Sequence, residues 1–520
     1  MKQFFIVLLL LPFSLAAQKA DVLIKNGKIL DGTGNSWHYG DIAIQNGKIA
    51  AMGKLSNWTA IKTLDATGLI VAPGFIDVHT HIEGEEKRNP TADNFIYDGV
   101  TTVVTGNCGG SNVNIATYFS MLDSLKTSIN VASLIGHNDV RKAVMGSAKR
   151  DPTEEEMKKM ETLVEQAMKD GAVGLSTGLI YIPGTYSKTE EVVRLAKVAS
   201  RFNGVYASHM RDEGDSVVQA IEEAMHIGRE AKIPVEISHF KLSGQQNWGR
   251  SKETVPMIIN ARKEGLDITI DQYPYTASST SLSTLLPDWV LADGQDSIKA
   301  RLARPEVQKE VSDYMLKKLK KRKLKNFSYP VVASFRADST FNGKSIEQVN
   351  LMKGRKHNPK QEAITIMEMM EQGGAGMVFH GMGDEDVKAI MRYPFNMFAS
   401  DAGIRIFNSG NPHPRGYGTN ARVLSKYVRD EKVISLEEAV RRMTSLPAQK
   451  FQLQNRGILR EGFAADIVIF DEEKVQDLST YDKPHQYTTG FKYVLVNGQL
   501  TVDEGKHIGT RAGNTLRLKM

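Results

Sequence analysis

The sequence has only one cysteine, Cys108, among its 520 residues. A chain with a single thiol cannot form an internal disulfide, so its fold depends on a hydrophobic core. Cys108 itself is then either an inert core residue or a chemically used one. At 41% hydrophobic and 24% charged residues, the composition is that of an ordinary globular protein with a sizeable core.

An excess of charge of one sign is also lacking, since the formal net charge is only +6. Basic residues cluster in one segment, "LKKLKKRKLK" at 316–325, and no aromatic residue interrupts it. Nucleic-acid-binding segments commonly combine basic and aromatic residues. We therefore interpret the segment as a solvated helix face and expect no nucleic-acid partner.

Long apolar runs are missing except at the start of the chain. Residues 1–17 combine Lys2, an apolar run and small residues suited to cleavage, which predicts a secretory signal peptide. The alternative is a buried N-terminal strand. The run is too short for a stable membrane anchor. We expect an exported protein, either periplasmic or secreted.

Both ends of the mature chain show the pattern of antiparallel hairpins. "ADVLIKNGKILDGTG" and "GDIAIQNGKIAAMG" alternate apolar and polar residues around Asn-Gly turns, and "ADIVIFDEEKV" and "FKYVLVNGQLTVDEG" repeat this near the C-terminus. We predict one small β-domain built from residues 18–72 and 451–520.

Residues 73–450 alternate apolar runs with amphipathic helical patterns, such as those at 154–171, 189–204 and 215–232. There are eight runs, from "GLIVAPGFIDVHTH" to "FNMFASDAG". Eight strand–helix units predict a closed (β/α)8 barrel of the TIM type, whose active site lies at the C-terminal strand ends. An open doubly wound sheet is the alternative. The interval of about 283–395 is too long for one connection, and we interpret it as an insertion over the barrel mouth.

Metal-binding residue types follow five of these runs. His79 and His81 point to the same side if the strand continues, because side chains alternate with a period of two. The complete set is His79, His81, Cys108, His209, His239 and Asp401. Imidazole and thiolate ligands favour zinc. A zinc-bound water beside a carboxylate is suited to hydrolysis of an amide or related C–N bond.

Several motifs resemble the amidohydrolase superfamily, and within it the N-acyl-D-amino-acid deacylases, or D-aminoacylases. They are "APGFIDVHTH", "TTVVTGNCG", "SHMRDEGD", "ISHFK", "DQYPYTASST", "ASDAG" and "HPRGYGT". The resemblance implies a zinc-carrying (β/α)8 barrel with a β-sandwich formed by both termini. Many superfamily members have a carboxylated lysine after strand four. Here "GAVGLSTGL" has none, and Cys108 would take its place as a ligand.

The resemblance also assigns roles to individual residues. Cys108, His209 and His239 would bind the tighter zinc. A second, weaker or vacant site would use His79, His81 and Asp401, and Asp401 would also be the general acid/base. One departure is that Ile82 precedes Glu83 after the second histidine, where the family often has an acidic residue directly.

The expected substrate is an N-acyl-D-amino acid, whose α-carboxylate needs an anchor. Candidates are Lys241, two residues beyond His239, together with Tyr273, Ser279 and Arg211. Two other functions compete with deacylation: hydrolysis of cyclic amides or imides, as in dihydroorotases and hydantoinases, and non-catalytic ligand binding by an exported protein. No pattern in the sequence indicates an oligomeric state.

Overall fold

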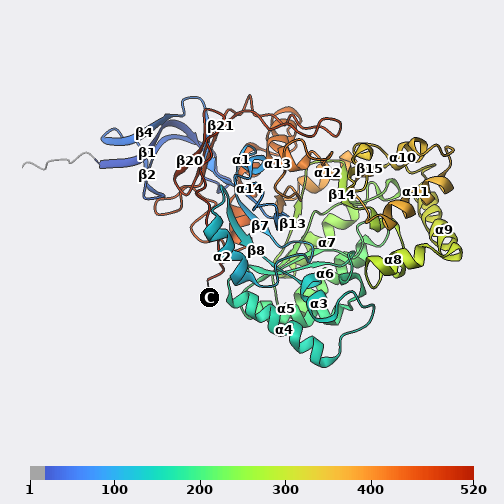
Figure 1. Cartoon of the computed structure of the whole chain (residues 1–520). Coiled ribbons are helices and arrows are strands. Elements are labelled where there is room, and N and C mark those ends of the chain that lie inside the picture. Colours follow the sequence, from blue (N-terminus) through green and yellow to red (C-terminus); the bar gives the residue numbers. More distant parts are fainter. Residues whose placement is uncertain (1–17, 520) are drawn as a thin grey trace, which may run out of the picture.

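The computed structural model describes residues 18–519, so the predicted signal peptide lies outside the described residues. Three parts are visible in Figure 1: a β-domain, a barrel surrounded by helices, and a mainly helical insertion. Within residues 18–519, no helix is both long and apolar enough to cross a membrane.

The β-domain joins the two ends of the chain in one nine-stranded sheet. β5 (Ile70–Pro73) holds the two ends together, because it pairs parallel with β1 and antiparallel with β18. One face buries branched aliphatic residues such as Ile24, Ile44 and Ile467. The N-terminal strands are β1 (Gln18–Ile29), β2 (His38–Gln45), β3 (Lys48–Gly53), β4 (Trp58–Asp65) and β5. The C-terminal strands are β18 (Ile467–Phe470), β19 (Phe491–Val496), β20 (Gln499–Asp503) and β21 (Lys506–His507).

The predicted barrel is present, and its strands pair in parallel in chain order. The third strand is divided at Leu134, whose N–H donates to the Thr105 carbonyl. First and last strands meet just beyond their ends, where the His81 N–H donates to the Ala402 carbonyl and the Asp401 N–H to the His79 carbonyl, each at 2.9 Å. The strands are β6 (Phe75–Asp77), β7 (Val100–Thr105), β8 with β9 (Asn130–Ser133, Ile135–Gly136), β10 (Gly174–Gly178), β11 (Val205–His209), β12 (Val235–Ile237), β13 (Ile268–Gln272) and β17 (Asn396–Phe398).

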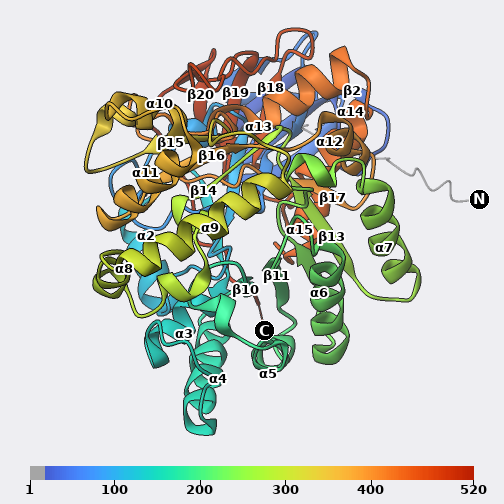
Figure 2. The ribbon, with the colours of Figure 1, turned by 90° about the vertical axis from the view of Figure 1, so that its right-hand side faces the viewer.

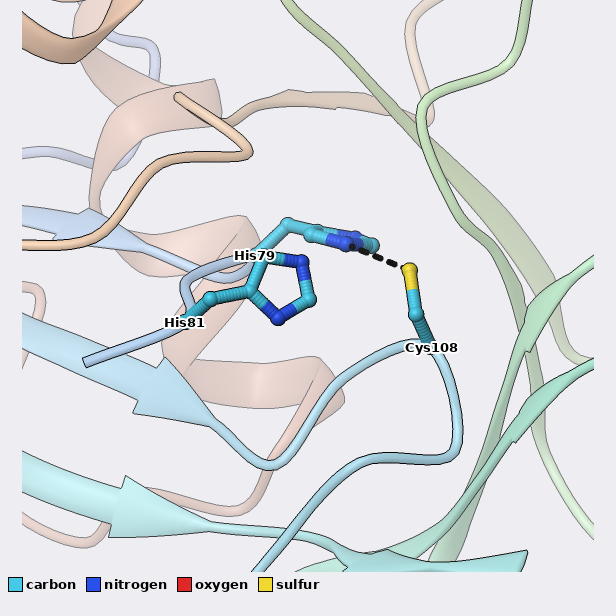
Figure 3. A group of neighbouring side chains, drawn as sticks. All are labelled: His79, His81 and Cys108. Atoms are coloured by element: carbon cyan, nitrogen blue, oxygen red, sulfur yellow. Dashed lines mark hydrogen bonds between the residues drawn. The ribbon is translucent and has the colours of Figure 1, made fainter. Parts of the chain in front are cut away.

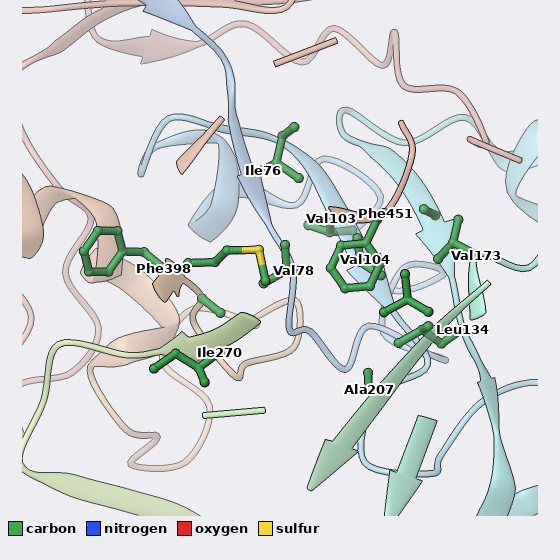
Figure 4. Packing of buried hydrophobic residues seen from close by; sticks show 14 of the residues in the cluster. Ile76, Val78, Val103, Val104, Leu134, Val173, Ala207, Ile270, Phe398 and Phe451 are labelled. Carbon is green, nitrogen blue, oxygen red and sulfur yellow. The ribbon is translucent and has the colours of Figure 1, made fainter. Parts of the chain in front are cut away.

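Amphipathic helices cover the barrel, and their apolar faces belong to the same core cluster as the barrel strands. Figure 4 shows part of this cluster, including Val103, Val104 and Ile270 of the strands. The start of α4 shows how the sequence sets a helix boundary: Thr153 and Glu156 form a reciprocal capping box that satisfies free N–H groups. The helices between barrel strands are α1 (Asp93–Ile96), α2 (Ile115–Leu125), α3 (His137–Met145), α4 (Glu154–Lys169), α5 (Thr189–Ser200), α6 (Val217–Ala231), α7 (Ser251–Lys263) and α12 (Asp384–Met391). After β17 follow α13 (Arg415–Arg422), the π-helix η6 (Val423–Asp430), α14 (Leu436–Met443) and α15 (Ser445–Lys450).

The insertion after β13 is a small unit with its own hydrophobic core. Its antiparallel sheet has the order β14 (Ala277–Ser281), β16 (Gly376–His380), β15 (Pro330–Ser334). Four helices surround this sheet: α8 (Gln295–Leu302), α9 (Pro305–Lys321), α10 (Ile346–Met352) and α11 (Pro359–Glu371). The unit thus runs from Ala277 to His380, whereas α12, inside the predicted interval of 283–395, packs beside α7 on the barrel. In Figure 2, α9 lies toward the viewer.

Candidate metal centre and active site

The structure brings the six predicted ligand residues together at the C-terminal end of the barrel. The Cys108 Sγ lies 3.3 Å from His79 Nε2, 3.5 Å from His209 Nδ1 and 3.6 Å from His239 Nε2. Figure 3 shows the Cys108 thiol facing His79, with His81 alongside. Cys108, His209 and His239 can each direct one ligand atom to a common point, and so can His79, His81 and Cys108.

Asp401 completes the cluster from the last barrel strand. Its Oδ1 lies 3.3 Å from His81 Nε2 and 3.7 Å from His79 Nε2. Its Oδ2 lies 2.9 Å from Nη1 of Arg415, a buried residue of α13. The carboxylate therefore stands between two imidazoles and a guanidinium. The Arg415 contact was not predicted, although "HPRGYGT" was among the motifs singled out.

Three of the predicted ligands have left-handed backbone conformations. The φ angles are 53° at Cys108, 38° at His239 and 49° at Asp401. Such angles are uncommon for residues other than glycine and cost of order 1–3 kcal/mol each. At each of these positions the chain turns sharply, two or three residues after the end of a barrel strand. The surrounding structure thus keeps three strained residues in the place where their side chains converge.

Gly178, at the end of the fourth barrel strand, makes room for the Cys108 loop. A Cβ atom at this position would lie 2.1 Å from the Cys108 carbonyl oxygen. No larger residue fits there without moving the loop. The close packing of Gly178 agrees with a site in which a thiol from strand two occupies the place of a lysine from strand four.

Two buried carboxylates hold the histidine segments in place through one ring contact and several backbone N–H contacts. The Asp271 Oδ2 lies 3.3 Å from His79 Nδ1, and its Oδ1 accepts the His239 N–H at 2.8 Å. Asp77 accepts N–H groups from His79 and Ser400, each at 3.1 Å, and so links the first and last strands. The role of Asp271 was not predicted, although a carboxylate inside the buried run "LDITIDQYPY" was a usable signal in the sequence.

Lys241 is close to the site but already has partners. Its Nζ lies 2.5 Å from Glu213 Oε1 and donates to the His239 carbonyl at 2.8 Å. The same Glu213 oxygen is 2.8 Å from His239 Nδ1. Glu213, four residues after His209, was missed by the sequence analysis. It fixes both Lys241 and the His239 ring.

The electrostatics of the cluster favour a bound cation. Burial alone would raise the pKa of the Cys108 thiol, but the neighbouring His79 and His209 imidazoles hold this pKa well below its ordinary value. Burial likewise opposes ionisation of Asp401, yet Arg415 and His81 keep its pKa well below the usual range. The buried His209 Nε2 has no hydrogen-bond partner among the described residues. A thiolate, a carboxylate and clustered imidazoles form a donor set that suits zinc.

A pocket opens onto this cluster and contains most of the predicted substrate contacts. Its wall includes His209, His239 and Asp401, together with Lys241, Tyr273 and Ser279. Arg211 is absent from the lining, because its guanidinium pairs with Glu223 and donates to two carbonyls, those of Thr185 and Ser187.

Two further histidines of the barrel have structural partners. His137 lies 2.8 Å from the Glu191 carboxylate, which also binds the buried Arg141. The His413 Nε2 lies 2.9 Å from the Ala277 carbonyl, so this ring ties the loop after β17 to the start of the insertion.

Comparison with known proteins places this geometry in a family. The chain matches the Amidohydrolase family over residues 62–325 and 332–502. It is 35% identical to a D-aminoacylase of Alcaligenes xylosoxydans xylosoxydans, and the match covers 96% of this chain and 98% of the relative. The chain belongs to the N-acyl-D-amino-acid deacylase family.

Solved structures of this family agree with the fold and with metal dependence. A D-aminoacylase described as having a binuclear metal centre superimposes with a TM-score of 0.82 at 32% identity, over 96% of this chain and 100% of that one. An N-acyl-D-glutamate deacylase from Bordetella bronchiseptica, complexed with zinc and a phosphonate inhibitor, gives the same TM-score and coverage at 33% identity. This deacylase-family chain is therefore a metal-dependent amidohydrolase.

Proposed function

We propose that the protein is a zinc-dependent hydrolase that cleaves N-acyl-D-amino acids to a carboxylate and a free D-amino acid. The observation that carries this proposal is the cluster of Cys108, His209 and His239 beside one pocket. The wall of this pocket includes His209, His239 and Asp401. A zinc ion held there would polarise the substrate carbonyl and lower the pKa of a bound water to about 7. The D-aminoacylase and D-glutamate deacylase relatives support the substrate class.

The residues of the cluster and its neighbours have different proposed roles in the reaction. Cys108, His209 and His239 would hold the tighter zinc, and His79, His81 and Asp401 would form a second, weaker site. Asp401 is the proposed general acid/base: its carboxylate takes a proton from the attacking water and delivers it to the leaving nitrogen. Arg415 keeps this carboxylate ionised and fixed in position.

The substrate α-carboxylate requires a fixed cation if D and L isomers are to be distinguished. Lys241 is the proposed anchor, with Tyr273 and Ser279 adding donors from the same pocket. Glu213 already holds the Lys241 ammonium group in place, so little side-chain entropy remains to be lost on binding.

The direct test is an assay of N-acetyl-D- and N-acetyl-L-amino acids with and without a chelator. Chelator-sensitive hydrolysis of the D series is expected. Hydrolysis of a hydantoin instead would favour the cyclic-amide alternative, and no turnover of any substrate would favour the binding-protein alternative.

The anchoring role of Lys241 can be tested separately. Lys241→Met should lower kcat/KM severely for N-acetyl-D-amino acids but little for the matching amides, which lack the charge. Because the change leaves Glu213 unpaired beside His239, the double variant Lys241→Met/Glu213→Gln is the matched control. Equal losses on acids and amides in both variants would exclude Lys241 as the anchor.

We also propose that the protein acts outside the cytoplasm, as the sequence of residues 1–17 suggests. Fractionation of cells producing the full chain and N-terminal sequencing of the product test this. Retention of residues 1–17 in a cytoplasmic fraction would contradict it.

A further inference from the structure

The basic segment at the end of α9 contains the most concentrated positive charge in the sequence. Residues 317–325 include seven lysines and arginines and no acidic residue. Within residues 18–519, only Lys321 of this segment pairs with a carboxylate, that of Asp215 at 2.7 Å. Cations at a helix C-terminus are stabilised by the helix dipole, which explains why such charges are tolerated there. It does not explain where their side chains point.

Three of these side chains line the same pocket as the metal cluster. They are Lys318, Lys321 and Arg322, whereas Lys317 and Lys320 of the same helix lie outside the pocket wall. Lys318 and Lys321 are exposed, while His209 and His239 are buried. The pocket therefore leads from a buried metal cluster to an exposed basic outer end. The interpretation of the basic segment as a solvated helix face therefore holds only for the side chains outside the pocket wall.

The acidic residues of the pocket wall neutralise only Lys321 at this outer end. Glu213 pairs with Lys241, and Asp401 pairs with Arg415. Asp215 pairs with Lys321, and Asp212 accepts the N–H groups of Gly214 and Ser216.

Lys318 and Arg322 are left without a carboxylate partner among the described residues. Instead, Lys318 Nζ lies 4.6 Å from the centre of the Tyr314 ring, and the Arg322 guanidinium lies 5.3 Å from that of Tyr329. They are four positions apart, where like charges on a helix repel each other, so an anion bound between them would relieve the repulsion.

We infer that the outer end of the pocket is a subsite for a second carboxylate of the substrate, bound by Lys318 and Arg322. This inference rests on the proposed deacylase function, in which the α-carboxylate is held near Lys241. The second carboxylate belongs either to the side chain of the D-amino acid or to the acyl group. The preferred substrates are then N-acyl-D-amino acids with two carboxylates.

Matched substrate pairs test the subsite. N-acetyl-D-glutamate is compared with N-acetyl-D-glutamine, and N-succinyl-D-leucine with its terminal amide, so that each pair differs by one charge. In at least one pair, the wild-type kcat/KM should be about tenfold higher for the charged member at low salt. The pair that shows the preference identifies the source of the second carboxylate.

Two double variants show which residues are responsible. Lys318→Gln/Arg322→Gln should abolish the preference, mainly by raising KM for the charged substrate, with the neutral substrate changed less than about twofold. Lys317→Gln/Lys320→Gln removes the same charge from the same helix outside the pocket, and it should retain the preference. A loss in both double variants would indicate a general field effect and overturn the subsite.

The remaining outcomes are equally decisive. Hydrolysis of all four substrates without any charge preference would overturn the subsite while leaving the deacylase function intact. A preference that survives Lys318→Gln/Arg322→Gln would also overturn the assignment. Absence of turnover for every substrate would overturn the proposed function, and the subsite with it.

Discussion

Replacing Asp401 with asparagine tests both the proposed catalytic role of its carboxylate and the contribution of its ion pair to stability. The change preserves shape but removes both the proposed proton acceptor and the charge opposite Arg415, 2.9 Å away. A general acid/base typically contributes about 10²–10⁴-fold to the rate, so kcat should fall by that factor. Substrate binding and the Cys108 site should be retained.

The stability cost follows from burial of the pair. Arg415 is only 3% exposed, and an unpaired charge at such a site costs about 3–5 kcal/mol. Asp401→Asn should therefore lower the urea midpoint of unfolding. Adding Arg415→Met removes the unpaired charge. The double variant should therefore recover much of the lost stability but none of the lost activity.

The assays are steady-state kinetics, elemental analysis for zinc and urea unfolding of both variants. A change in KM alone would show that Asp401 binds substrate and that another group is the base. A double variant no more stable than Asp401→Asn would refute the argument about the buried pair.

Three further predictions concern Cys108 of the cluster, the supporting carboxylate of Asp271, and Lys450, a buried residue at the end of α15. Cys108→Ala should lose the tightly held zinc and most activity, and full zinc occupancy by elemental analysis would contradict its assignment as a ligand. Asp271→Asn should weaken zinc binding by about 10–100-fold, because the carboxylate contacts the His79 ring and the His239 backbone N–H. Chelator competition measures this affinity, and an unchanged value would show that Asp271 has only a structural role. Burial lowers the pKa of Lys450 to about 8, so the unfolded state binds more protons between pH 8 and the ordinary value of 10.5. Stability relative to Lys450→Met should thus rise with pH across this window, and a fall would refute the shift.

The barrel and the convergence of the six candidate ligand residues at one end of it could be predicted from the sequence. Each strand is an apolar run bounded by turn residues, and parallel strands direct their C-terminal ends to one side of the barrel. Ligands placed just after such runs must therefore meet, whatever the exact length of the intervening helices.

The finer contacts could not be predicted, because the strand pattern stops at the site itself. The alternation argument directs Arg211 to the same side as His209, but β11 ends at His209 and the following loop carries Arg211 to Glu223. The left-handed turn at His239 breaks the pattern in the same way before Lys241. The partners Glu213 and Arg415 depend on loop paths that no local periodicity encodes.

The closure of the barrel through His79 and Asp401 has a consequence for biosynthesis. The contacts that seal it join residues far apart in the chain; Asp77 and Ser400, for example, are 323 positions apart. A nascent polypeptide that stops short of β17 already contains Cys108, His209 and His239, yet its first strand lacks its neighbour. Contacts of such long sequence separation form late in folding. We therefore expect metal capture to follow completion of the whole chain, so that zinc content reports how much of a preparation has finished folding.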